Sequence, residues 1–427
     1  MTNNIKDLLA YLDNSPTSYQ AAEQTISSLA RAGFEELKED SAFCIEKGGK
    51  YYVCRSDSAV IAFVMGEIDP HETGFNLAAA HLDSPLFKIK PETVKTVQGI
   101  TRVGVEVYGG PIISTWLDRE LSIAGKVIVR NGFVTGEKYK SILVNIPRPL
   151  AIIPNAAIHM NREINKGFEY NKQMHLQAIL STSSTAENPL KQLIADELGV
   201  LVENVSEMDL YLYDSQKAGV VGIDQDMISS GRLDDLAMSH AILMALQSRE
   251  RVGATAVGVF YDNEEIGSQT IQGAMGSFLG DVLERICLGR GLGKEQYLMA
   301  LKKSFLISAD MAHAFHPGYA EKHDPAYAPQ MNAGPVIKIN GNFRYATTSE
   351  TMVRFIQLCQ DTNTPYQKFM TRSDMPCGST IGPIASSQLG INTIDIGNPM
   401  WAMHSIRETC GIKDHEALIT VLQQYWQ

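Results

Sequence analysis

The feature that most constrains this chain is a set of largely apolar, strand-length segments that are each followed by acidic or histidine residues. The segments at 75–81, 254–261, 305–309 and 392–397 have the character of buried strands, and residues 232–247 have that of a helix. This mixture predicts an α/β fold, and open α/β sheets bind ligands beyond the carboxyl ends of their strands. One edge of the sheet is therefore expected to gather polar side chains from distant parts of the chain. The polar residues at these points are His81, Asp234, Glu264, Glu265, Asp310 and His404.

The length of the chain and a change in residue pattern along it predict two structural units. The chain has 427 residues, whereas single hydrophobic cores usually stop growing at about 250–300 residues. Residues 93–227 are dominated by alternating, strand-like stretches, and Asn131-Gly132 is typical of a hairpin turn. We expect 93–227 to be an inserted β-rich domain, with 1–92 and 228–427 forming a discontinuous α/β domain.

Composition limits the class of protein. The net charge is −11, from 48 acidic and 37 basic residues, which argues against nucleic-acid binding because that needs a basic surface. No signal peptide is visible, and no segment approaches the ~20 apolar residues of a membrane span. The six cysteines contain no CxxC pair, as expected of free thiols. These features predict a cytoplasmic protein with no membrane or nucleic-acid partner.

The residue types at the predicted sheet edge suit a pair of divalent ions. Imidazole and carboxylate ligands favour zinc, with cobalt or manganese as alternatives. Two neighbouring ions need a shared anionic bridge, and two-metal hydrolases use such a site to activate water. Of the adjacent Glu264 and Glu265, one could bind metal while the other takes the proton of the water. The competing interpretation of this pair is an acidic helix start. Asp83, two residues after His81, could orient that imidazole.

Other motifs do not carry a competing chemistry. His313 and His316 are three residues apart, but Pro317-Gly318 makes a sustained helix unfavourable there, so we interpret both as pocket residues. LGRGLGKE at 288–295 fails the GxxxxGK[ST] pattern of a phosphate loop, and no GxSxG elbow of a serine hydrolase occurs.

Seven motifs, in family order over nearly the whole chain, resemble those of the M18 metallopeptidases, a family that includes aspartyl aminopeptidase and vacuolar aminopeptidase I. They are HLDSP (81–85), YGGPIISTWLDRELSIAGKV (108–127), SGRLDDLAM (230–238), DNEEIGS (262–268), SADMAHAFHP (308–317), DMPCGSTIGP (374–383) and AMHSIRE (402–408). One departure is Gly318, where the family often has Asn after the His-Pro pair.

The resemblance implies a zinc-peptidase-like catalytic domain with an inserted β-rich dimerisation domain. It also implies that dimers assemble into dodecamers. At matching positions it implies that His81 and Asp310 bind one ion, that Glu265 and His404 bind the other, and that Asp234 bridges them. Glu264 would be the general base, with Asp83 behind His81. The implied substrate-binding residues are His159, His313, Lys338 and Tyr345, of which His159 would reach a neighbouring subunit's active site.

The expected function is therefore removal of one N-terminal residue from peptides with a free N-terminus. By the resemblance to aspartyl aminopeptidases, the ammonium of Lys338 would favour an acidic N-terminal residue, Asp or Glu. The alternatives are a structural lysine with its charge in solvent and an enzyme that prefers a neutral or apolar N-terminal residue. A related two-metal deacylase or carboxypeptidase, or a non-catalytic cargo protein on the same scaffold, stays open as a weaker interpretation.

Overall fold

The computed structural model describes residues 1–130, 138–184 and 187–427. The chain divides into two compact units. The first comprises Met1–Asp83, Ala218–Met403 and Glu408–Gln427, and the second comprises Ser84–Lys217 and His404–Arg407. Among the described residues, no helix is long and apolar enough to cross a membrane.

The first unit is built on a mixed sheet in the strand order β1-β2-β3-β14-β4-β15-β19-β17-β18. Its centre is parallel, because β14 pairs with β4, β4 with β15 and β15 with β19 in the same direction. The carboxyl ends of these four strands therefore meet at one edge. The bounds are β1 Glu35–Glu36, β2 Lys50–Arg55, β3 Ala59–Val64, β4 Phe75–His81, β14 Thr255–Tyr261, β15 Phe305–Ala309, β17 Val336–Ile339, β18 Gln367–Met370 and β19 Asn392–Gly397.

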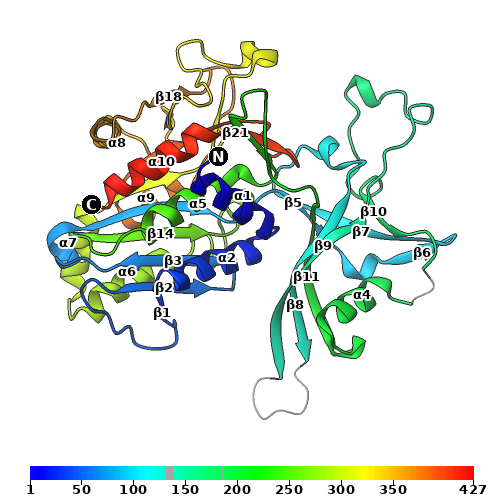
Figure 1. Ribbon diagram of the computed structural model, residues 1–427, viewed down its shortest axis with the longest axis horizontal. Helices are drawn as coiled ribbons and strands as arrows, with labels where there is room; N and C mark the ends of the chain where they lie inside the picture. Colours follow the sequence, from blue (N-terminus) through cyan, green and yellow to red (C-terminus); the bar gives the residue numbers. More distant parts are fainter. Residues whose placement is uncertain (131–137, 185–186) are drawn as a thin grey trace. The chain divides into compact units, whose positions relative to one another are not determined.

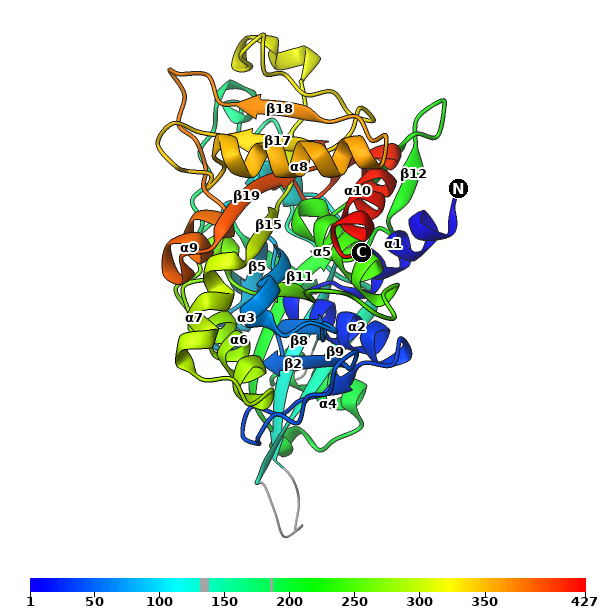
Figure 2. The ribbon, with the colours of Figure 1, turned by 90° about the vertical axis from the view of Figure 1, so that its left-hand side faces the viewer.

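Helices cover both faces of this sheet (Figures 1 and 2). Strand residues alternate between the two cores, as in β4, where Ala78 and Ala80 pack in one and Leu77 and Ala79 in the other. A sheet buried on both sides needs apolar residues at most positions, which accounts for the largely apolar character of these strands. One face carries α1 (Asn3–Asn14), α2 (Ser18–Arg31), α5 (Leu233–Gln247), α8 (Ser349–Asp361) and α10 (Ile412–Tyr425). The other carries α6 (Phe278–Gly289), α7 (Lys294–Lys303) and α9 (Ile381–Leu389).

A smaller sheet in the first unit joins segments that are far apart in sequence. Its order is β12-β13-β21-β20-β16. The bounds are β12 Gly219–Val221, β13 Met227–Ser230, β16 Ala312–His313, β20 Pro399–Trp401 and β21 Glu408–Gly411. It holds the chain beyond β15 against the segment that leads into α5.

The second unit is β-rich and has its own hydrophobic core. Its strands pair antiparallel in the order β10-β7-β5-β11-β8-β9, with β6 beside β7, and the helix α4 (Pro189–Leu198) packs on them. The predicted Asn131-Gly132 turn lies outside the described residues, but β8 and β9 on either side of it pair from Arg130 and Tyr139 onward. The bounds are β5 Leu86–Ile89, β6 Lys95–Val97, β7 Ile100–Tyr108, β8 Leu121–Arg130, β9 Tyr139–Ala151, β10 Gln177–Ser181 and β11 Val205–Asp214.

The α/β fold predicted from sequence is confirmed, and the observed unit boundaries differ from the predicted ones. The first boundary falls at 83/84 instead of 92/93, because β5 pairs with β7 and β11 of the second unit. The second falls at 217/218 instead of 227/228, because β12 pairs with β13 of the first unit.

Candidate metal centre

The strand ends of the first unit bring most of the predicted site residues together. His81 is the last residue of β4, Asp310 follows β15, and Glu264 and Glu265 lie in a short 3-10 helix, η5 (Glu264–Ile266), after β14. Parallel pairing sets Tyr261 beside His81 and Ser308 beside Ala79, so the three strands end side by side. The cluster thus arises from strand register, since each polar side chain sits where its apolar run stops.

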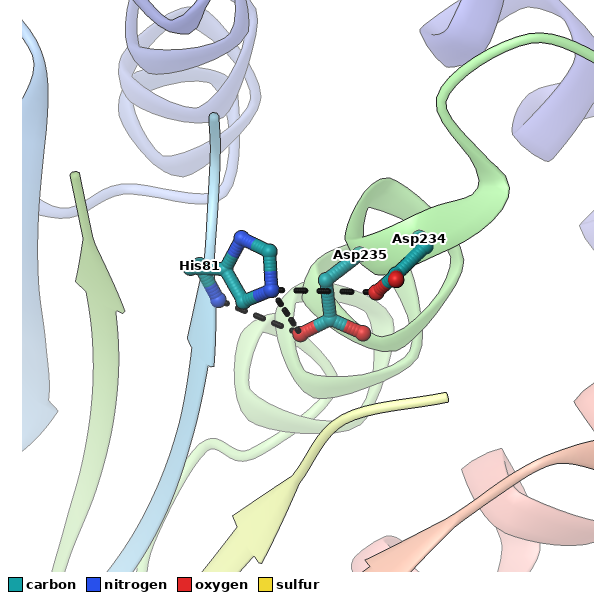
Figure 3. Close-up of side chains that lie close together, drawn as sticks. All are labelled: His81, Asp234 and Asp235. Atoms are coloured by element: carbon teal, nitrogen blue, oxygen red, sulfur yellow. Dashed lines mark hydrogen bonds and ion pairs between the residues drawn. The ribbon is translucent and has the colours of Figure 1, made fainter. Parts of the chain in front are cut away.

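His81 is held with one ring nitrogen turned toward two aspartates (Figure 3). Its Nδ1 lies 3.0 Å from the backbone oxygen of Asp83 and 3.3 Å from the Asp83 carboxylate. Its Nε2 lies 3.7 Å from Asp234 Oδ1 and 4.0 Å from Asp235 Oδ2. Asp83 therefore favours the proton on Nδ1 and leaves the Nε2 lone pair for a metal ion, as a carboxylate behind a ligating histidine does.

Asp83 also fixes the segment that carries both glutamates. Its two carboxylate oxygens accept hydrogen bonds from the backbone N–H groups of Glu264 and Glu265, each at 3.1 Å. One buried carboxylate thereby couples the orientation of His81 to the position of η5. Sequence predicted only its contact with His81.

Asp235 is a site residue that the sequence reasoning missed. It is fully buried, and its Oδ2 accepts a hydrogen bond of 3.2 Å from the backbone N–H of His81. Asp234 and Asp235 both have non-helical backbone angles at the start of α5, and their peptide bond is cis. The available signal was the second acid in RLDDLAM, which looks like an ordinary acidic helix start.

The buried carboxylates of the cluster lie so close together that a neutralising positive charge would stabilise them. Burial first, and then the carboxylates of Asp310, Asp83 and Asp234, raise the pKa of Glu264 to about 8 against the opposing effect of His81. Burial followed by the charge of Asp234 also raises the pKa of Glu265 well above its ordinary value. Buried carboxylates repel one another until protons or a metal neutralise them.

The histidine shows the complementary shift. Burial alone would lower the pKa of His81, but the carboxylates of Asp235, Asp83 and Glu264 raise it well above its ordinary value. His81, Asp234 and Asp235 form one potential ligand group and His81, Glu264 and Glu265 another, with ligand atoms within 4.8 Å of one another in each. This donor set of imidazole and carboxylates fits zinc.

Asp310 forms an ion pair with Lys338. The Lys338 ammonium lies 2.7 Å from Asp310 Oδ1, and the lysine side chain is almost completely buried, at 2 % exposure. Its Nζ also lies 5.5 Å from the centre of the Tyr345 ring. A buried ammonium needs such a partner, so the pair holds the Asp310 carboxylate in one orientation.

Beside these residues lies a cavity of about 240 Å³, which two of the predicted substrate-binding residues, His313 and Tyr345, help to line. Lys338 is not among the described residues that line it. The remaining predicted residues, His159 and His404, belong to the second unit. His159 is exposed in a turn, and His404 Nδ1 lies 3.1 Å from the backbone oxygen of Gly110. The roles of His159, His404 and Lys338 stay predictions.

A carboxylate-rich cluster around a histidine, at the carboxyl ends of parallel strands, has the features of a metal-dependent hydrolase centre. The family model for aminopeptidase I zinc metalloproteases (M18) matches residues 11–426. The chain therefore belongs to the M18 family and is a metalloaminopeptidase.

Curated relatives and solved structures agree with this assignment. A probable M18 family aminopeptidase 2 of Clostridium novyi is 44% identical over 433 residues and covers 100% of both chains. A protein of the same description from Clostridium acetobutylicum is 45% identical, covering 96% of this chain and 95% of the relative.

Among solved structures, Ape4 in its complex with Nbr1 is 36% identical with a TM-score of 0.94, covering 99% of this chain and 85% of that chain. The S. cerevisiae mApe1 dodecamer is 28% identical with a TM-score of 0.87, covering 99% of this chain and 96% of that chain.

Proposed function

We propose that the protein is a dinuclear zinc aminopeptidase that removes one residue from the free N-terminus of peptides. His81 and Asp310 would hold one ion, Glu265 and His404 the other, and Asp234 would bridge them. The observation that carries the proposal is the geometry around His81, whose Nε2 faces Asp234 and Asp235 while Asp83 engages Nδ1. Bound zinc would supply the Lewis acidity that lowers the pKa of a water molecule and polarises the scissile carbonyl.

Glu264 is the proposed general base. Its carboxylate would take a proton from the attacking water and then deliver it to the leaving amine. The hydrogen bond from its backbone N–H to Asp83 keeps η5 in place while the side chain exchanges the proton. The adjacent Glu265, held by the other oxygen of Asp83, is then available as a ligand.

An aminopeptidase requires the free α-amine of its substrate. The zinc-loaded protein should therefore hydrolyse aminoacyl reporters and leave the matching N-acetylated reporters intact, and a chelator should abolish the activity. The control is recovery of the activity when zinc is added back. Hydrolysis of the acetylated reporters at a similar rate would favour a deacylase and contradict the proposal.

For specificity we propose a preference for acidic N-terminal residues, Asp or Glu. The support is the cavity beside the metal centre, which is lined by three histidines and Lys322 and by no carboxylate among its described lining residues. Lys338, whose ammonium is engaged with Asp310, would act on specificity only if it also reached the substrate. A neutral or apolar preference is the alternative.

We further propose that the protein is a homo-oligomer built from dimers, as a dodecamer, with an active site completed by His159 of a neighbouring subunit. The dodecameric state of mApe1 supports the assembly, and the exposure of His159 leaves its imidazole accessible. In the neighbouring subunit's active site, the His159 imidazole would donate a hydrogen bond to the developing oxyanion.

Subunit exchange tests the shared site. Glu264→Gln and His159→Ala should each be nearly inactive, because one lacks the base and the other its oxyanion donor. After random exchange of subunits, about a quarter of the sites would combine an intact base with an intact partner histidine, so about a quarter of wild-type turnover should return. Full activity of His159→Ala alone, or hybrids that form without any activity, would rule out sharing.

A further inference from the structure

The cavity beside the metal centre contains two histidines whose hydrogen-bonding roles are fixed by backbone amides. The N–H of Gly318 donates to Nδ1 of His316 at 3.1 Å. A ring nitrogen that accepts a hydrogen bond carries no proton, so the proton of the neutral His316 ring must lie on Nε2. This imidazole is therefore held as a donor through Nε2.

Glycine at position 318 permits this contact. A Cβ atom there would lie 3.2 Å from Cε1 and 3.4 Å from Nδ1 of His316, so a side chain would press on the ring. Gly318 is also the position at which the chain departs from the pattern that the sequence otherwise resembles. Glycine at position 318 therefore affects the orientation of the His316 ring in the cavity.

His323 is fixed in the complementary way. Its Nε2 accepts a hydrogen bond of 3.1 Å from the backbone N–H of His316, so its proton lies on Nδ1. Burial and the neighbouring His316 lower the pKa of His323, which favours the neutral ring. In the part of the chain that the structure describes, neither His316 Nε2 nor His323 Nδ1 has a hydrogen-bond partner.

The rest of the cavity wall suits an anion. Lys322, between the two histidines in sequence, adds an ammonium, and no described lining residue is acidic. Phe369, Met400 and Trp401 supply apolar surface for the methylene groups of a side chain. A carboxylate can accept from both imidazoles. A carboxamide has only one oxygen to share between the two donors, and its NH₂ group, itself a donor, would have no acceptor to face among the two imidazole N–H groups and the Lys322 ammonium.

We propose that His316 and His323 are specificity-determining residues that donate hydrogen bonds to the side-chain carboxylate of the substrate's N-terminal residue. This assignment rests on the proposed function, an aminopeptidase that prefers acidic N-terminal residues, and names two residues that would bind the acidic side chain. Lys322 strengthens the same selection through its charge. The two imidazole donors discriminate between a carboxylate and the isosteric amide by hydrogen bonding. A positive potential without directed donors would give a smaller difference in kcat/KM between the two.

The test compares kcat/KM of the zinc-loaded protein for aspartyl, glutamyl, asparaginyl, glutaminyl and leucyl reporters. His316→Phe and His323→Phe keep a planar ring but remove the donors. Each should lower kcat/KM for the two acidic reporters about 10–100-fold, the usual effect of losing a hydrogen bond to a charged group. The leucyl value should change less than about 3-fold. His71→Phe, on the helix α3 (Pro70–Thr73) and outside the cavity lining, is the matched control and should change no ratio.

Lys322→Met is an independent variant at an exposed position, where a change of side chain leaves the core intact. It should lower kcat/KM for the acidic reporters about 3–10-fold and spare the leucyl reporter. A fall shared equally by all reporters, no change in any ratio, or a wild type that cleaves only neutral reporters would overturn the proposal while leaving the aminopeptidase standing. A zinc-loaded wild type that cleaves none of the five would overturn both.

Discussion

Replacing Glu264 with glutamine should leave both metal ions bound and remove nearly all turnover. Glutamine has the shape of glutamate but cannot take a proton from water, and loss of a general base typically lowers kcat by about 10²–10⁴-fold or more. Glu264 reaches Asp83 through its backbone N–H, so the substitution leaves that contact in place. Stopped assays with an aminoacyl reporter at saturating concentration measure kcat directly.

The control for this variant is the neighbouring glutamate. Glu265→Gln should weaken metal binding, because Glu265 is a proposed ligand, and excess zinc should restore part of its activity. Excess zinc should not restore Glu264→Gln. Substantial kcat in fully metallated Glu264→Gln would show that another group is the base.

Replacing Asp234 with alanine should deplete both ions, more than loss of any other ligand. Asp234 is the only residue proposed to contact both ions, and without it two cations would face each other with no shared anion. The residue is buried, its Oδ1 lies 3.7 Å from His81 Nε2, and its backbone N–H donates to Glu408 at 3.1 Å. The backbone contact is independent of the side chain, so the start of α5 should persist in the variant. Metal analysis of purified protein measures the loss.

Asp310→Ala is the matched comparison for Asp234→Ala. Asp310 is a proposed ligand of one ion only, so this variant should retain the other. It also leaves the ammonium of Lys338 buried without its partner, so thermal melting should show a lower stability than that of Asp234→Ala. Loss of a single ion from Asp234→Ala would mean that Asp234 is not the bridge.

The elements that position the site could be predicted from sequence because each has a strong local signal. Largely apolar, strand-length segments predicted β4, β15 and β19 at their observed residues, and the polar residues at or after the ends of these segments pointed to the sheet edge. A parallel sheet buried on both faces leaves little choice of residue along a strand, so its ends are visible in the sequence. The M18 family, predicted from motifs, is confirmed.

What sequence could not supply depends on pairing between distant segments. The unit boundary at Ser84 is set by strand pairing of β5 with β11, more than a hundred residues later, which no local pattern reveals. Asp235 could not be recognised from sequence, because two adjacent acidic residues before an apolar helix match an ordinary helix start. The ion pair of Lys338 with Asp310 joins β17 to the residue that follows β15, and these two strands are not neighbours in the sheet. The donor roles of His316 and His323 depend on which backbone amide each ring meets.

Zinc content and turnover, measured on the same samples of wild type, Glu264→Gln and Asp234→Ala, test most directly whether a two-metal centre with a glutamate base performs the reaction. The expected result is two zinc ions per chain with full turnover in the wild type, two zinc ions with almost no turnover in Glu264→Gln, and neither zinc nor turnover in Asp234→Ala. A wild type that keeps its turnover after chelation, or that reaches full turnover with one zinc ion per chain, would contradict the dinuclear mechanism.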